Sequence, residues 1–102
     1  MRKILVIEDD SKVREVIFDI LGEGGYKVYT SADGKSGIDL AYEIKPDLIL
    51  CDIMMPKVDG YEVFNKLKEF LDENFISFVY LTAKSTPNNV REGMQRGADD
   101  YI

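Results

Sequence analysis

Short apolar runs alternate along this chain with longer segments whose apolar residues recur at helical spacing. The apolar runs occupy residues 4–7, 48–51 and 76–81. Runs of this length, rich in β-branched residues, are typical of strands buried on both faces of a parallel sheet. Residues 26–30 have the aromatic and β-branched bias of a half-exposed strand.

The segments between the runs are predicted to be helices that pack on the sheet through one face. The apolar residues from Val13 to Leu21 follow the spacing of a helix stripe, with Asp10 or Ser11 available as its N-cap. Similar spacing predicts helices over 38–44, 63–71 and 85–96. Strand–helix alternation of this kind favours an α/β fold with right-handed crossovers and helices on both faces of a parallel sheet. A length of 102 residues is typical of one domain.

Composition excludes several functions. The chain has no histidine and one cysteine, Cys51, which excludes histidine-based catalysis, ordinary zinc sites and an internal disulfide. Thirteen basic against nineteen acidic residues give a net charge of −6, which disfavours direct binding of nucleic acid. No apolar stretch approaches the roughly 20 residues that span a membrane. We expect a reduced, cytoplasmic setting with no membrane partner.

Polar residues follow each buried run. Glu8, Asp9 and Asp10 come after the first, Asp52 after the second, and Thr82 and Ala83 after the third. The carboxyl ends of parallel strands meet at one edge of the sheet, where ligands bind in such folds. Taken singly, the acidic triplet is equally consistent with a solvated turn that caps a helix, and Asp52 with a structural role.

Taken together, these residues indicate a magnesium site. Clustered carboxylates repel one another, and Mg²⁺ is the hard cation that resolves this repulsion with oxygen ligands. A carboxylate beside Mg²⁺ is also a plausible nucleophile toward phosphorus, giving an aspartyl phosphate. A hydroxyl on the next strand can then hydrogen-bond the phosphoryl group.

The sequence resembles the receiver domains of two-component response regulators, a family that includes the chemotaxis response regulator. The resemblance is carried in order and spacing by residues 4–10, 52–56 with Asp59 and Gly60, 81–83, and 97–102. It implies a flavodoxin-like, doubly wound parallel sheet with strand order 2-1-3-4-5. It also implies phosphorylation by a sensor histidine kinase or phosphotransfer protein, and an output domain or protein.

The resemblance assigns roles by position. Asp52 matches the phospho-acceptor. Glu8, Asp9, Asp52 and the backbone carbonyl of Met54 match the Mg²⁺ ligands, with Asp9 the closer member of the acidic pair.

Four further positions match residues that respond to the phosphoryl group. Thr82 matches the switch hydroxyl, the amide of Ala83 a phosphoryl contact, and Tyr101 the switch aromatic. Lys84, like Met54, matches a variable position that tunes dephosphorylation. Residues 82–84 follow the third run and Tyr101 begins the expected fifth strand.

Receiver domains carry a lysine two positions beyond Ile102. We therefore expect residues 1–102 to be a C-terminally incomplete receiver domain, truncated within the fifth strand and lacking the last helix. A sheet face without that helix predicts self-association through the truncated face, or low stability.

Two alternatives stay open at this stage. One is a hydrolase of the haloacid-dehalogenase type, which needs its nucleophile after the first strand and a second acid two residues on. The other is a binding or assembly module on the same scaffold that accepts no phosphate, because the usual lysine is absent from these residues.

Overall fold

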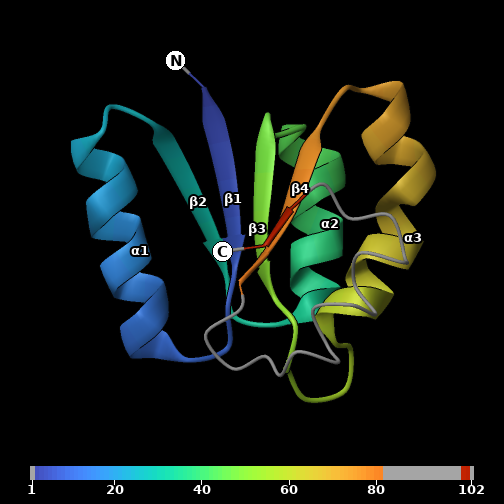
Figure 1. Ribbon diagram of the computed structural model, residues 1–102, viewed down its shortest axis with the longest axis horizontal. Coiled ribbons are helices and arrows are strands. Elements are labelled where there is room, and N and C mark those ends of the chain that lie inside the picture. The colour runs from blue at the N-terminus through green and yellow to red at the C-terminus, as the bar shows by residue number, and fades with distance from the viewer. Residues whose placement is uncertain (1, 82–99, 102) are drawn as a thin grey trace.

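Strands and helices alternate along the chain in the computed structural model, which describes residues 2–81 and 100–101 (Figure 1). The elements are β1 (Lys3–Ile7), α1 (Ser11–Glu23), β2 (Lys27–Ser31), α2 (Gly34–Ile44), β3 (Leu48–Asp52), α3 (Gly60–Glu73), β4 (Ser77–Leu81) and β5 (Asp100–Tyr101). The predicted helix over 85–96 lies outside the described residues. Among the described helices, none is long and apolar enough to cross a membrane.

The strands form one parallel sheet with the order β2-β1-β3-β4-β5, as predicted. The chain therefore moves outward from β1 to β2, crosses back to β3 and continues to β4 and β5. This reversal places the ends of β1 and β3 side by side at the centre of the sheet (Figure 1). Ligands bind at such a switch point in open parallel sheets.

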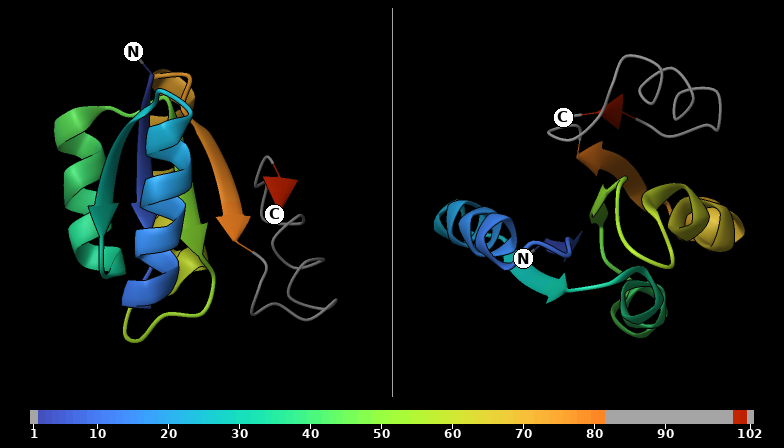
Figure 2. Two further views of the ribbon diagram at one scale, coloured as in Figure 1. Left: turned by 90° about the vertical axis from the view of Figure 1, so that its left-hand side faces the viewer. Right: turned by 90° about the horizontal axis from the view of Figure 1, so that it is seen from below.

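The helices form two layers, with α1 on one face of the sheet and α2 and α3 on the other (Figure 2). The larger core lies between the sheet and the α2–α3 layer, and it joins Leu5 and Ile7 of β1 to Leu67 of α3. A smaller cluster on the opposite face joins Ile4, Val6 and Leu50 to α1. The central strands β1 and β3 are thus buried from both sides, which explains why their sequences are continuous apolar runs.

Helix α1 packs less completely than its apolar stripe predicts. Ile17 and Leu21 contact the smaller cluster, but the side chains of Val16 and Ile20 are 55% and 62% exposed. At about 100° per residue, Val16 and Ile20 lie on one flank of the stripe, and the helix meets the sheet through the other flank. The expectation that the whole stripe is buried is therefore wrong for these two residues.

Strand β4 is buried on one face only, in contrast to the expected run buried on both. Phe78 and Tyr80 are fully buried and pack edge-to-face against Phe64 and Tyr61 of α3. The alternate residues are half-buried or, at Ser77, exposed. The α2–α3 layer reaches β4, whereas the described part of the other face offers β4 no helix.

Leu67 is fully buried in the centre of the larger core, so its truncation tests the packing of α3. We expect Leu67→Ala to lower the free energy of unfolding by about 2–5 kcal/mol, because it removes buried methyl groups and leaves a cavity. Ile20→Ala on exposed α1 is the control and should change it by about 0.5 kcal/mol or less. Urea denaturation of both variants measures the difference. Equal losses would contradict this placement of the core.

Candidate metal and phosphorylation site

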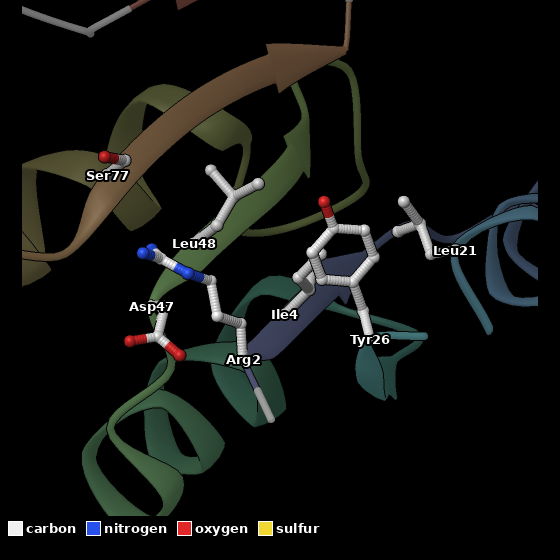
Figure 3. Close-up of a pocket in the computed structure, with 7 residues that line it drawn as sticks. All are labelled: Arg2, Ile4, Leu21, Tyr26, Asp47, Leu48 and Ser77. Atoms are coloured by element: carbon white, nitrogen blue, oxygen red, sulfur yellow. The ribbon is translucent and has the colours of Figure 1, made fainter. Parts of the chain in front are cut away.

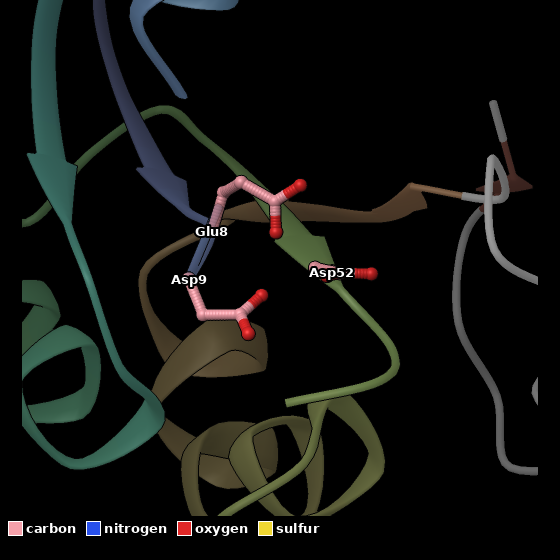
Figure 4. A group of neighbouring side chains, drawn as sticks. All are labelled: Glu8, Asp9 and Asp52. Carbon is pink, nitrogen blue, oxygen red and sulfur yellow. The ribbon is translucent and has the colours of Figure 1, made fainter. Parts of the chain in front are cut away.

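The register of β1 and β3 brings two carboxylates together. Ile7 pairs with Cys51, so the residues that follow them, Glu8 and Asp52, emerge side by side at the carboxyl edge of the sheet. Asp9 joins them from the turn after β1 (Figure 4). One carboxylate oxygen from each of Glu8, Asp9 and Asp52 lies within 4.8 Å of the other two. The sequence-predicted acidic cluster therefore forms, with these three members.

The backbone of Glu8 is held from two directions. Its N–H donates to the carbonyl of Ser31 at the end of β2 (3.0 Å), and its carbonyl accepts from the guanidinium of Arg14 in α1 (2.8 Å). The Glu8 side chain is only 2% exposed. Sequence reasoning missed the support from Arg14 and Ser31, because neither residue belongs to a local motif with Glu8.

Asp10 has a different role from its two acidic neighbours. Its side chain accepts hydrogen bonds from the N–H groups of Lys12 (2.9 Å) and Val13 (3.2 Å) and is the N-cap of α1. The capping interpretation of the acidic triplet is therefore correct for Asp10. Asp9 is half-buried and belongs to the carboxylate cluster.

Asp52 is the last residue of β3 and pairs with Leu81 of β4. Its side chain is 2% exposed, although it is acidic. The chain then runs through a loop and returns to Asp52 at the start of α3, where the N–H of Gly60 donates to the carbonyl of Ile53 (2.9 Å). Asp59 and Glu62 form a capping box that sets this helix start.

The cluster creates a negative field that reaches the neighbouring thiol. Burial is the main cause that raises the pKa of Cys51 well above its ordinary value of 9.0, and the charges of Asp52, Glu8 and Asp59 raise it further. The thiol is fully buried and donates to the carbonyl of Asp52 (3.3 Å). Cys51 is therefore a protonated core residue and no nucleophile.

A pocket of about 440 Å³ opens beside Asp9. Its wall includes Asp33, which caps α2 and accepts from the backbone and hydroxyl of Ser36; these hydrogen bonds hold the pKa of Asp33 below 3.8. The rest of the wall comes from the start of α2 and the loop before α3, including Lys35 and Lys57. Asp9 is thus the member of the cluster that borders this pocket.

A second pocket, of about 410 Å³, lies at the opposite edge of the sheet (Figure 3). Ile4, Leu21 and Tyr26 line one side, and Asp47, Leu48 and Ser77 the other. Except for Leu21 near the end of α1, its lining residues lie at or next to the starts of the strands β1 to β4. The pocket is therefore separated from the carboxylate cluster by the length of the strands. It holds no cluster of ligating side chains.

The structure describes the surroundings of only some of the other predicted site residues. Met54 lies in the loop two residues after Asp52, with its side chain 54% exposed. Tyr101 belongs to β5, where it pairs with Tyr80. Thr82, Ala83 and Lys84 lie outside the described residues.

Comparisons with known proteins agree with this fold. The sequence model of the response regulator receiver domain matches residues 4–102. The chain is 28% identical to the chemotaxis protein CheY4 of Vibrio cholerae, with a TM-score of 0.90 over 100% of this chain and 85% of that one. It is 32% identical to the BeF3-activated receiver domain of RstA from Klebsiella pneumoniae, with a TM-score of 0.90 over 99% and 84% of the two chains.

A third similar structure is the N-terminal domain of a response regulator receiver protein from Methanoculleus marisnigri JR1. It is 33% identical, with a TM-score of 0.85 over 100% of this chain and 83% of that chain. The chain belongs to the response regulator receiver domain family and has its flavodoxin-like fold. The family consists of signalling domains of two-component systems.

The buried thiol provides a test of the electrostatics at the site. We expect native Cys51 to react with a disulfide reagent at about pH 8 only through unfolding, because its raised pKa keeps it protonated and burial blocks access. The folded state binds the thiol proton more tightly than the unfolded chain does. This contribution to stability is therefore present below the ordinary pKa of 9.0 and is lost as the pH rises from there toward the folded value.

Absorbance of the released thiolate measures the reaction, and the urea-unfolded chain is the control that should react at once. Rapid reaction of the folded chain would contradict this environment for Cys51.

Proposed function

We propose that this domain is a phosphorylation-dependent switch in which Asp52 accepts the phosphoryl group. The observation that carries the proposal is the position of Asp52: a nearly buried carboxylate at the end of the central strand β3, with Glu8 and Asp9 beside it. Isolated buried charges are costly unless they are compensated. A carboxylate held in this way is placed for chemistry with a cation and a phosphoryl group.

The donor set fits Mg²⁺. Three carboxylates within 4.8 Å supply hard oxygen ligands, and two of them are removed from water by burial. Mg²⁺ prefers such oxygens and keeps positions for water and phosphate. We assign Glu8, Asp9, Asp52 and the backbone carbonyl of Met54 as the groups that would hold it. When bound, the ion supplies positive charge that offsets the charge on the transferring phosphoryl group.

The proposed reaction is phosphoryl transfer from a phosphohistidine of a partner protein. A carboxylate oxygen of Asp52 attacks phosphorus, so that an O–P bond forms and the N–P bond breaks. The electron pair of the broken bond returns to the imidazole nitrogen of the donor. Hydrolysis of the resulting acyl phosphate releases inorganic phosphate and restores the Asp52 carboxylate, so the domain resets.

The response to phosphorylation is assigned to the residues after β4 and in β5. Leu81 pairs with Asp52, and Thr82 is the next residue of the chain, so the proposed switch hydroxyl follows the strand that borders the acceptor. The amide of Ala83 is proposed as a second phosphoryl contact. Tyr101, whose strand neighbour is Tyr80, is proposed as the switch aromatic.

Partners follow from membership of the family. Receiver domains interact with histidine kinases or phosphotransfer proteins and with output domains. We propose such a kinase or phosphotransfer protein as the donor here, and an output domain or protein of a type that the site does not specify. The cytoplasmic setting, the lack of direct nucleic acid binding and self-association stay predictions.

The arrangement argues against a hydrolase of the haloacid-dehalogenase type. Such an enzyme needs its nucleophile after the first strand and a second acid two residues on. In this chain the residue two positions after Glu8 is Asp10, which caps α1, and Asp52 is the last residue of the third strand of the sequence, β3.

Replacement of Asp52 tests the acceptor. Incubated with acetyl phosphate and Mg²⁺, the full-length protein that carries residues 1–102 should gain one phosphoryl group that hydroxylamine removes, as expected for an acyl phosphate. Asp52→Asn should abolish this gain, because an amide oxygen is a poor nucleophile. Asp39→Asn, an exposed aspartate on α2, is the matched control and should be labelled normally. Intact-protein mass spectrometry measures the modification.

Three outcomes separate the functional classes. Stable labelling that depends on Asp52 supports the switch, whereas release of phosphate without any labelled protein indicates a hydrolase. If the protein is not labelled and no phosphate is released, the result indicates a binding module. Undiminished labelling of Asp52→Asn would reject Asp52 as the acceptor.

Neighbouring aspartates provide a matched test of the metal site. We expect Asp9→Asn to weaken Mg²⁺ binding by about tenfold or more, because it replaces a carboxylate of the cluster. Asp10→Asn removes the same charge one residue away and keeps a good N-cap, so it should change the affinity by less than about threefold. Calorimetric titration with Mg²⁺ measures both. Equal affinities of the two variants would exclude Asp9 as a ligand.

A further inference from the structure

The first turn of α3 lies directly against the peptide that follows Asp52. The N–H of Gly60 donates to the carbonyl of Ile53 (2.9 Å). A Cβ atom at Gly60 would lie 2.5 Å from the carbonyl oxygen of Asp52 and 2.9 Å from Cα of Ile53. Both of these neighbours are backbone atoms, so no rotation of a side chain can relieve the overlap. Only a residue without Cβ fits between α3 and this peptide.

The requirement at Gly60 is for space and not for an unusual backbone conformation. Gly25 is the only glycine with positive φ among the described residues, so alanine can adopt the backbone of Gly60. Alanine also has a higher helix propensity than glycine. Any loss of Mg²⁺ affinity or of labelling rate caused by Gly60→Ala therefore arises from the contact with the Asp52–Ile53 peptide.

Neither side of this contact can retreat freely. Helix α3 is anchored by Tyr61 and Val63, which are 7% and 0% exposed, and the ring centroid of Tyr61 lies 5.3 Å from that of Tyr80. On the other side, Asp52 is held by its pairing with β4, and Ile53 is 1% exposed. An added Cβ would thus displace either the helix start or the peptide that carries the Asp52 carboxylate.

We infer that Gly60 is a positioning residue for Asp52: its missing side chain lets α3 hold the acceptor carboxylate in place beside Glu8 and Asp9. The inference rests on the proposed function of the site. Other closely packed glycines have different neighbours, since Cβ atoms at Gly34 and Gly37 would first meet Val58 and the side chain of Ile7. The contact with the acceptor is specific to Gly60 among the described glycines.

The test is Gly60→Ala in the full-length protein, with two readouts. Mg²⁺ titration should show an affinity about tenfold lower or more, as for loss of a group that orients a metal ligand. The initial rate of labelling by acetyl phosphate should fall by about 100-fold, because a displacement of about 1 Å is enough to misalign a reacting group. Both readouts are taken at a temperature at which circular dichroism shows the variant to be folded.

Two control variants distinguish an effect on the position of Asp52 from an effect on the stability of the fold. Gly22→Ala in α1 adds a Cβ with no atom within 4 Å and should leave both readouts unchanged. Leu71→Ala removes a buried side chain from the far end of the same helix, about 16 Å from Gly60 at roughly 1.5 Å per residue. It should lower the melting temperature yet keep normal Mg²⁺ affinity and labelling while folded.

The outcomes distinguish the two proposals. A folded Gly60→Ala protein with normal Mg²⁺ affinity and normal labelling would overturn the role of Gly60. Wild-type protein that binds Mg²⁺ but is never labelled would overturn the acceptor role of Asp52. In that case the Mg²⁺ affinity of Gly60→Ala would still test whether Gly60 positions the Asp52 carboxylate. If Gly60→Ala is unfolded in buffer, trimethylamine N-oxide is added to favour the folded state. Weak Mg²⁺ binding by the refolded variant supports the inference, and normal binding rejects it.

Discussion

The parallel pairing of β1 with β3 is the constraint on which the site depends. Because Ile7 faces Cys51 across this pair, Glu8 and Asp52 reach the edge of the sheet together, although 44 residues separate them in sequence. A shift of register by one residue would reverse the faces of every side chain on one strand, so that Leu5 and Ile7 would leave the larger core for the opposite face of the sheet. The burial of Ile7 and Cys51 therefore maintains the spacing of the carboxylates.

Two carboxylates of the cluster, those of Glu8 and Asp52, are supported through the nearby backbone by elements from elsewhere in the chain. Glu8 is tied to the end of β2 and to α1, whereas the peptide after Asp52 is tied to the start of α3. These contacts keep the carboxylates close together, although like charges repel one another. In the proposed function, this arrangement of carboxylates is the site for a divalent cation.

Much of the architecture could be predicted from local patterns. The continuous apolar runs located the central strands β1 and β3, and the helical spacing of apolar residues located α1, α2 and α3 to within a few residues of their ends. The prediction for α1 was less accurate, since Val16 and Ile20 are exposed. Periodicity identifies the apolar side of a helix, but the part of that side that is covered depends on the width and curvature of the sheet beneath it.

The sequence by itself determined the alternation of strands and helices, the sheet class and the carboxylates at the strand ends, because these follow from local periodicity and from the chemistry of single residues. Only the tertiary structure decided which member of the acidic triplet caps a helix and which two join Asp52. It also decided that Gly60 lies against the Asp52–Ile53 peptide. These are relations between segments far apart in the chain, and they are set by strand register and helix packing, which leave no local signal in the sequence.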